Sequence, residues 1–212
     1  MRFIFFLIIP FIVCGQINFV DSNGLKQGNW QLFFPFNSDS VISEEGFFVN
    51  NLEEGTWLSY HENGQLREIS NYSQGKLDGV RVSISKRGKL NEQEFYKEGQ
   101  HNGRQMYFHD NGKVNIEVFY TIGVKQGVYS KYYRNGKIQE TCNYVNGYKD
   151  GLAVWYFDNE VISIQYKYDT GVIVDTAFAY YKNGNLKSQS IYKDNELNGE
   201  KTVFFSDGVI KE

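Results

Sequence analysis

The feature that most constrains this chain is an opening residue, usually glycine, that returns every 24 residues. A fixed period of this length is typical of repeat proteins, in which each unit is one supersecondary element stacked against its neighbours. We therefore interpret the chain as a repeat array before looking for any other motif. The opening residues are Gly55, Gly79, Gly103, Gly127, Gly151, Asp175 and Gly199.

The same residue types return at fixed distances behind each opening residue. The position five residues after the opening residue is mostly aromatic. Asn-Gly or a related pair follows at positions eight and nine, and an aliphatic residue at position eleven. Tyr stands seventeen on and Gly twenty on in most units. A less regular first unit begins at Gly28, so the pattern predicts about eight units. In the unit that opens at Gly55 these residues are Tyr60, Asn63, Gly64, Leu66, Tyr72 and Gly75.

Each unit is expected to be one β-hairpin. Asn-Gly between alternating apolar residues is a strong hairpin signal. Aromatics make up 17% of the chain, with 21 Gly and only 2 Pro, which suits short strands and tight turns. A three-residue loop with Gly in the left-handed conformation would pair Tyr60 with Leu66. The predicted fold is all-β, an elongated and twisted antiparallel β-meander of repeated hairpins.

Alternation along the strands predicts two different faces. Odd positions after each opening residue, such as Val128, Tyr132 and Cys142, are expected to form one apolar face, and even positions a wetter one. Either the sheet coils so that its aromatic residues pack on themselves, or a partner covers the apolar face. Cys142, the only cysteine after residue 15, is expected to be a small buried hydrophobe.

The first 15 residues have a different composition from the rest. Met1 and Arg2 form a short basic start, and the residues from Phe3 to Val13 are apolar without interruption. This pattern predicts a signal peptide over 1–15, with cleavage after Gly15, and a single repeat domain over 16–212. A lipoprotein that begins at Cys14 is the second alternative. The predicted location is secreted, periplasmic or in the cell envelope, with no membrane span in the mature chain.

The repeat resembles a known family. Gly-x-Trp-x-x-Tyr-x-x-Asn-Gly-x-Leu, followed by Tyr-x-x-Gly-x-x-x-Gly, is similar to the MORN-repeat variant of the YwqK-type family, often labelled as antitoxins. The resemblance runs from Gly28 to the C-terminus, with Arg87, Glu160 and Asp175 as departures. It implies a non-catalytic β-sheet scaffold, and the antitoxin label implies that such a scaffold binds a toxic partner protein.

The chain shows no combination of residues typical of an enzyme. His61 and His109 occupy the same repeat position two units apart, about 19 Å, which is too far to share a metal ion. Glu68, Glu92 and Glu140 recur thirteen positions on. Rather than a glycosidase pair, we expect structural roles, with Glu92 and Glu140 near the outer end of the strand or accepting hydrogen bonds there. We therefore expect no catalytic residue, no cofactor and no metal. The net charge of -3, without charged runs, argues against nucleic acid as a partner.

Aromatic residues at even positions are the candidate binding residues. Those from three successive units would form one patch if the face is contiguous; the alternative is that cross-strand aromatic pairs only stabilise the sheet. The predicted function is a scaffold that binds another protein, and the alternative is a carbohydrate or cell-wall binding module. The candidate residues are Trp57, Tyr129, Tyr133, Trp155, Phe157 and Tyr181.

Overall fold

The computed structural model describes residues 16–35 and 41–211. The predicted signal peptide, 1–15, with Cys14, lies outside the described residues. The described part of the chain folds into β-strands joined by turns, and it contains no helix long and apolar enough to cross a membrane.

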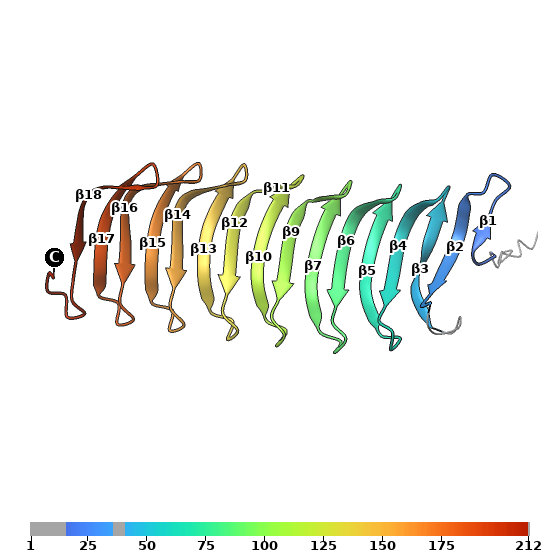
Figure 1. Cartoon of the computed structure of the whole chain (residues 1–212), viewed down its shortest axis with the longest axis horizontal. Coiled ribbons are helices and arrows are strands. Elements are labelled where there is room, and N and C mark those ends of the chain that lie inside the picture. The colour runs from blue at the N-terminus through green and yellow to red at the C-terminus, as the bar shows by residue number, and fades with distance from the viewer. Residues whose placement is uncertain (1–15, 36–40, 212) are drawn as a thin grey trace, which may run out of the picture.

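Eighteen strands form a single antiparallel sheet in which neighbours in the sequence are neighbours in space (Figure 1). β8 and β9 are two parts of one strand that pairs with β7, and β11 and β12 are likewise two parts of one strand that pairs with β10. The strands are β1 (Phe19–Val20), β2 (Lys26–Phe33), β3 (Ile42–Val49), β4 (Leu52–Tyr60), β5 (Leu66–Ser73), β6 (Lys76–Ile84), β7 (Leu90–Lys97), β8 (Gln100–His101), β9 (Gly103–Phe108), β10 (Val114–Thr121), β11 (Val124–Lys125), β12 (Gly127–Tyr132), β13 (Ile138–Val145), β14 (Tyr148–Tyr156), β15 (Ile162–Asp169), β16 (Val172–Tyr180), β17 (Leu186–Lys193) and β18 (Glu196–Val203).

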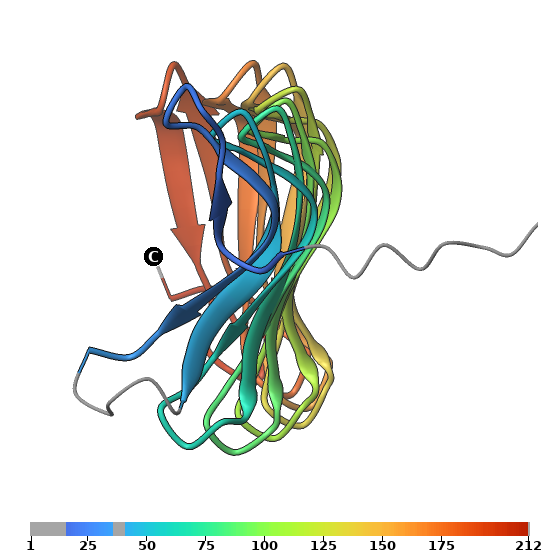
Figure 2. The same cartoon turned by 90° about the vertical axis from the view of Figure 1, so that its right-hand side faces the viewer.

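The predicted all-β antiparallel meander is confirmed. The sheet is one layer thick along its whole described length, and its strands bend and turn progressively from the blue to the red end (Figure 2). Such turning follows from the right-handed twist of L-peptide strands, which accumulates over many neighbours.

The hairpin tips have the predicted geometry. Tyr60 pairs with Leu66, and the Gly64 amide donates a hydrogen bond to the His61 carbonyl at 2.8 Å. Gly64 has a φ of 78°, a conformation that glycine adopts without steric cost. The three-residue loop with a left-handed Gly is therefore correct. It returns at the tips that contain Gly88, Gly112, Gly136, Gly184 and Gly208.

The predicted division of the faces is wrong, because each hairpin contains a second bulge. Ser59 pairs with Glu68 and Tyr60 with Leu66, so Arg67 is an extra residue on its strand. One extra residue inverts the alternation beyond it. The same shift occurs in the other hairpins, between Lys131 and Tyr132 for example. Even positions of the first strand therefore share a face with odd positions of the second.

The face that carries the core is called the aromatic face below. In the unit of β4 and β5 it comprises Gly55, Trp57, Ser59, Glu68, Ser70 and Tyr72, and elsewhere their 24-residue equivalents. Within 16–35 and 41–211, every buried residue except Val154 lies on this face. Most of them stand two or fifteen positions after an opening residue, where the two strands pair directly. The other side of the sheet is called the opposite face. The buried residues of the aromatic face are Phe48, Trp57, Ser59, Ser70, Glu94, Gln105, Val118, Cys142, Ala153, Ala177 and Ser190.

Cys142 is buried as predicted, at 4% exposure. Burial raises the pKa of its thiol to about 11, so the thiol is protonated and unreactive at neutral pH.

Candidate interaction surface

A row of tyrosines follows the long axis of the aromatic face, one from each of six units. Most of these rings are only half-buried, so they form a surface as well as a core. Burial raises the pKa of Tyr96 to about 12, with a further contribution from the Glu94 carboxylate. Neutral phenols offer hydrogen bonds and ring faces together, which is why tyrosine is favoured at protein interfaces. The row comprises Tyr72, Tyr96, Tyr120, Tyr144, Tyr168 and Tyr192.

In the C-terminal half of this face the rings contact one another and lysine side chains. Trp155 packs edge-on against Tyr166 with ring centroids 5.8 Å apart, and Tyr166 packs against Tyr192 at 6.0 Å. The Lys149 ammonium lies 4.8 Å from the Trp155 centroid and 5.6 Å from that of Tyr168. A cation over an aromatic ring is attracted by its negative face, so Lys149 orients these rings.

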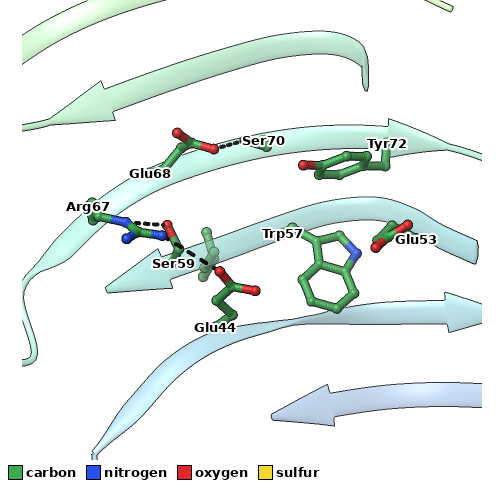
Figure 3. A pocket seen from close by; sticks show the side chains of 9 residues that line it. Glu44, Glu53, Trp57, Ser59, Arg67, Glu68, Ser70 and Tyr72 are labelled. Carbon is green, nitrogen blue, oxygen red and sulfur yellow. Dashed lines mark hydrogen bonds and ion pairs between the residues drawn. The ribbon is translucent and has the colours of Figure 1, made fainter. Parts of the chain in front are cut away.

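In the N-terminal half the face contains a small acidic pocket (Figure 3). Glu44, Glu53 and Glu68 surround it, with the Trp57 and Tyr72 rings beside them. Its volume is about 100 Å³, below the roughly 300–1,000 Å³ of typical small-molecule sites. The pocket therefore has room for one side chain rather than for a cofactor.

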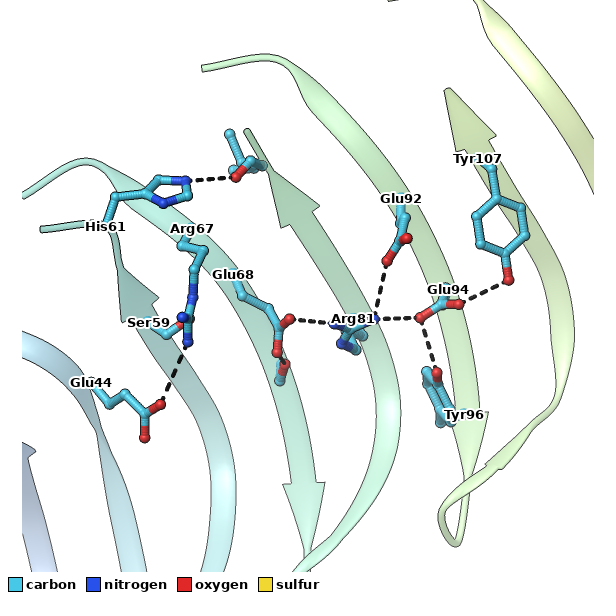
Figure 4. A network of polar contacts seen from close by, with 12 residues as sticks. Glu44, Ser59, His61, Arg67, Glu68, Arg81, Glu92, Glu94, Tyr96 and Tyr107 are labelled. Atoms are coloured by element: carbon cyan, nitrogen blue, oxygen red, sulfur yellow. Dashed lines mark hydrogen bonds and ion pairs between the residues drawn. The ribbon is translucent and has the colours of Figure 1, made fainter. Parts of the chain in front are cut away.

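Beside this pocket, Arg81 joins three carboxylates from both neighbouring strands (Figure 4). Its guanidinium lies 2.5 Å from Glu68, 2.7 Å from Glu94 and 3.3 Å from Glu92. Glu94 is 4% exposed and also accepts hydrogen bonds from Tyr96 and Tyr107, both at 2.9 Å. Burial alone would raise the pKa of Glu94, but these hydrogen bonds outweigh burial and hold its pKa below the ordinary value.

The recurring glutamates have the hydrogen-bonding roles that the sequence predicts. Glu68 and Glu92 pair with Arg81, and Glu140 accepts a hydrogen bond from Lys149 at 2.8 Å. Arg81 and Lys149 themselves were missed, because no motif marks them. The residue types at their repeat positions vary from unit to unit, with Trp57 and Gln105 equivalent to Arg81 and Leu77 and Ile173 equivalent to Lys149.

The structure separates the six candidate aromatics into three places. Trp57 is 7% exposed and packs edge-on against Phe48 at the N-terminal end of the face. Tyr129 and Trp155 also lie on the aromatic face, half-buried, two strands apart. The remaining three, Tyr133, Phe157 and Tyr181, stand in a row at the hairpin tips.

The tip row connects consecutive units. The Tyr133 hydroxyl donates to the carbonyl of Tyr156 at 2.6 Å, and the Tyr181 hydroxyl donates to that of Phe204 at 2.8 Å. His61 and His109 make the same bridge, through Nε2, to the carbonyls of Ile84 and Tyr132, both at 2.9 Å. Both histidines are half-buried. Partner binding by the six candidates stays a prediction.

Among the described residues, no group of three or more His, Cys, Asp or Glu side chains is arranged to hold a metal ion. His101 instead lies between two tyrosine rings of the aromatic face, 4.6 Å from Tyr96 and 5.1 Å from Tyr120 between centroids. The polar groups of this part of the face therefore contact one another.

Comparison with known families agrees with the repeat geometry. The family model described as "MORN repeat variant" matches residues 53–74, 102–121, 125–146 and 176–194. Each matched segment covers most of one hairpin, namely β4 with β5, β9 with β10, β12 with β13, and β16 with β17. A search of curated proteins finds no match. The chain thus contains MORN-variant repeats in these four segments.

Proposed function

We propose that the chain is a secreted, non-catalytic scaffold that binds another protein along its aromatic face. MORN-variant repeats support the scaffold role. The observation that carries the proposal is the aromatic face itself, a half-exposed row of tyrosines that crosses six units of a one-layer sheet. Contiguous exposed aromatic surface of this kind is typical of protein interfaces.

The first test is capture of partners from the envelope and medium of the source cells with the processed chain, read by mass spectrometry. Two variants in the same strand, β14, make a matched pair. Trp155→Ala changes the aromatic face, and Leu152→Ala removes a side chain that is 56% exposed on the opposite face. The proposal expects one stoichiometric protein that Trp155→Ala loses and Leu152→Ala keeps. Equal retention by both variants would place binding elsewhere.

The YwqK-type resemblance makes a toxic protein the first class of partner to test. Co-expression of a captured partner with and without the scaffold measures this directly. Growth arrest by the partner alone, relieved by the wild-type scaffold and not by Trp155→Ala, is the expected outcome for an antitoxin. A partner that is harmless when expressed alone would be compatible with the scaffold function but would contradict the antitoxin function.

A carbohydrate or cell-wall ligand is the second candidate. The observation that favours it is the cluster of rings around Tyr166, which includes Trp155, Tyr168 and Tyr192. Sugar rings stack on exposed aromatic faces. Because each unit adds two strands, successive tyrosines of the row are ~10 Å apart. Binding to peptidoglycan or to a polysaccharide fraction that Trp155→Ala abolishes would support this function, and no binding to any fraction would exclude it.

Secretion rests on the basic and apolar character of residues 1–15. Intact-mass analysis of the natural protein tests it, since signal cleavage after Gly15 leaves a chain that begins at Gln16. A lipid-modified chain that begins at Cys14 would support the lipoprotein alternative. A chain that retains Met1 inside the cell would contradict secretion.

A further inference from the structure

The aromatic face has an acidic N-terminal half and a basic C-terminal half. From β2 to β7 five carboxylates face three cations. From β11 to β18 four lysines face the Glu140 carboxylate, and the carboxylate of Asp175, at an opening position, is paired instead with Lys167 of the opposite face. The first half therefore keeps an excess of negative charge and the second an excess of positive charge. The N-terminal set is Glu44, Glu53, Glu68, Glu92 and Glu94 with Lys26, Arg67 and Arg81; the C-terminal set is Lys125, Lys131, Lys149 and Lys201 with Glu140.

These charges are not neutralised within their own halves. Arg81 alone serves three carboxylates, and Glu53 has no cationic partner among the described residues although it lines the pocket. On the basic side, Lys131 stands opposite Glu140, whose carboxylate is already bound by Lys149. Lys125 lies over the Tyr144 ring at 5.1 Å. Each half therefore offers unsatisfied charge to a partner.

The two halves lie on either side of an uncharged hairpin, β9 and β10. There the aromatic face presents Gln105, Tyr107, Val118 and Tyr120. The hairpin of Arg81 precedes it directly, and the hairpin of Lys125 and Lys131 follows it directly. A two-fold axis through β9 and β10, parallel to the strands, would bring each acidic half over a basic half.

We infer that the partner of the aromatic face is a second copy of this chain, packed face to face in the antiparallel direction. This inference rests on the proposed function and names its partner. A two-fold interface is self-complementary, so one surface must carry both members of every contact. The opposite charges on the two halves meet this requirement, and complementary charge sets the orientation of a complex.

The face is large enough for a stable dimer. The strands extend over roughly 75 Å at ~4.8 Å per strand when β8 with β9 and β11 with β12 each count as one strand. A strand of eight residues adds about 26 Å of width at ~3.3 Å per residue. A stable interface needs only ~800 Å² per partner, so partial coverage is sufficient. Twisted sheets also pack face to face at a small angle, which lets the halves align.

The test uses two charge-reversal variants of the processed chain and sedimentation velocity as the readout. Lys125→Glu with Lys131→Glu makes the basic half acidic, and Glu53→Lys with Glu92→Lys makes the acidic half basic. A matched control, Lys86→Glu with Arg87→Glu, makes the same change in charge at an exposed hairpin tip. The dimer predicts that the wild type and the control sediment as dimers that weaken in high salt, and that each reversal variant alone is a monomer.

Mixing the two reversal variants is the decisive arm, because each then offers the charges that the other lacks. Recovery of a heterodimer is expected, and it also shows that both variants are folded. A wild type that stays monomeric at every concentration overturns the dimer, and so does a mixture of folded variants that fails to pair. If the wild type is monomeric while Trp155→Ala still loses a captured protein, the scaffold function stands and only the self-association fails.

Discussion

At the scale of single residues, the aromatic face depends on close fits between neighbouring units. Gly46 in β3 has the indole ring of Trp57 directly over its α-carbon, so an added methyl group would overlap the ring. This contact explains why the position carries Gly, although the other units carry larger residues there, such as Ser70 and Cys142.

Gly46→Ala is therefore expected to destabilise the protein by about 1–3 kcal/mol, the usual cost of overpacking a core. Urea unfolding followed by tryptophan fluorescence measures the change. A double-mutant cycle with Trp57→Leu is the control, since removing the ring should recover most of the loss. Additive effects of the two changes would show that the indole is not the cause.

Glu94 predicts a specific dependence of stability on pH. Its pKa is held below the ordinary value in the folded protein by hydrogen bonds from Arg81, Tyr107 and Tyr96. A depressed folded-state pKa contributes stability that is complete above the ordinary glutamate range and is lost as the pH falls through the lowered value. Hydrogen bonds to a charged group are worth ~1.5–3 kcal/mol each, so we expect Glu94 to make a measurable contribution to the free energy of unfolding.

The measurement is the urea midpoint of wild type and Glu94→Gln between neutral and strongly acidic pH. We expect Glu94→Gln to be less stable at neutral pH, with a difference that shrinks as the pH falls below about 4.5. Other carboxylates titrate in both proteins, so only the difference reports on Glu94. A difference that stays constant with pH would contradict the role given to this carboxylate.

At the scale of the element, four hairpins are each tied to the next one by a hydrogen bond from the side chain six positions after the opening residue. Tyr133 and Tyr181 make this bridge through their hydroxyls. Phe157 occupies the same position without a hydroxyl, and its ring contacts Lys182 at 5.8 Å. The bridge of this unit is therefore missing one hydrogen bond.

Phe157→Tyr should restore the bond, to the carbonyl of Tyr180, and stabilise the array by about 0.5–1.5 kcal/mol. Tyr133→Phe is the matched control and should destabilise it by a similar amount. Thermal unfolding of both variants beside the wild type gives the result. Opposite shifts are expected; a loss of stability in Phe157→Tyr would show that the ring has no room for the hydroxyl.

Glu160 is an unfavourable residue in its hairpin. It takes a φ of 69° at a position where most units have Gly, such as Gly64 with 78°. The left-handed conformation costs a residue with a β-carbon about 1–2 kcal/mol, whereas the exposed ion pair of Glu160 with Lys137 contributes less than about 1 kcal/mol. Backbone strain therefore outweighs the ion pair.

Glu160→Gly is thus expected to raise the melting temperature, with Lys137→Met as the variant that removes the ion pair alone. Both variants lose the ion pair, so the difference between them reports the backbone strain. If Glu160→Gly melts no higher than Lys137→Met, no strain is relieved and the argument from backbone strain fails.

Much of the element structure follows from the sequence, and one local irregularity does not. Asn63-Gly64 requires a specific turn, so the loop and the pairing of Tyr60 with Leu66 are predictable. The bulge at Arg67 has no comparable signature, because many residue types adopt its conformation. The only trace is a column that is polar in every unit, with Arg67, Asn91 and Asn115 as examples. A prediction that omits this bulge separates Trp57 and Tyr129 from the face that carries the core, whereas the structure places both on it.

At the scale of the whole molecule, the protein is a one-layer sheet whose core lies on one side. In a two-layer protein a second sheet or a helix covers such a face. Here half-exposed tyrosines extend along it instead, with an acidic half before β9 and a basic half after β10. The central claim is that a protein partner covers this face in the assembled state.

Lysine acetylation followed by mass spectrometry tests this claim most directly. Lys125 and Lys131 report on the aromatic face, and Lys167 on the opposite face and Lys182 at a hairpin tip are the internal references. Labelling is compared between the protein in its native envelope and the same protein purified and diluted. We predict that Lys125 and Lys131 are protected in the envelope and become reactive on dilution, while Lys167 and Lys182 react equally in both. Equal reactivity of all four lysines in the two states would contradict a covered aromatic face.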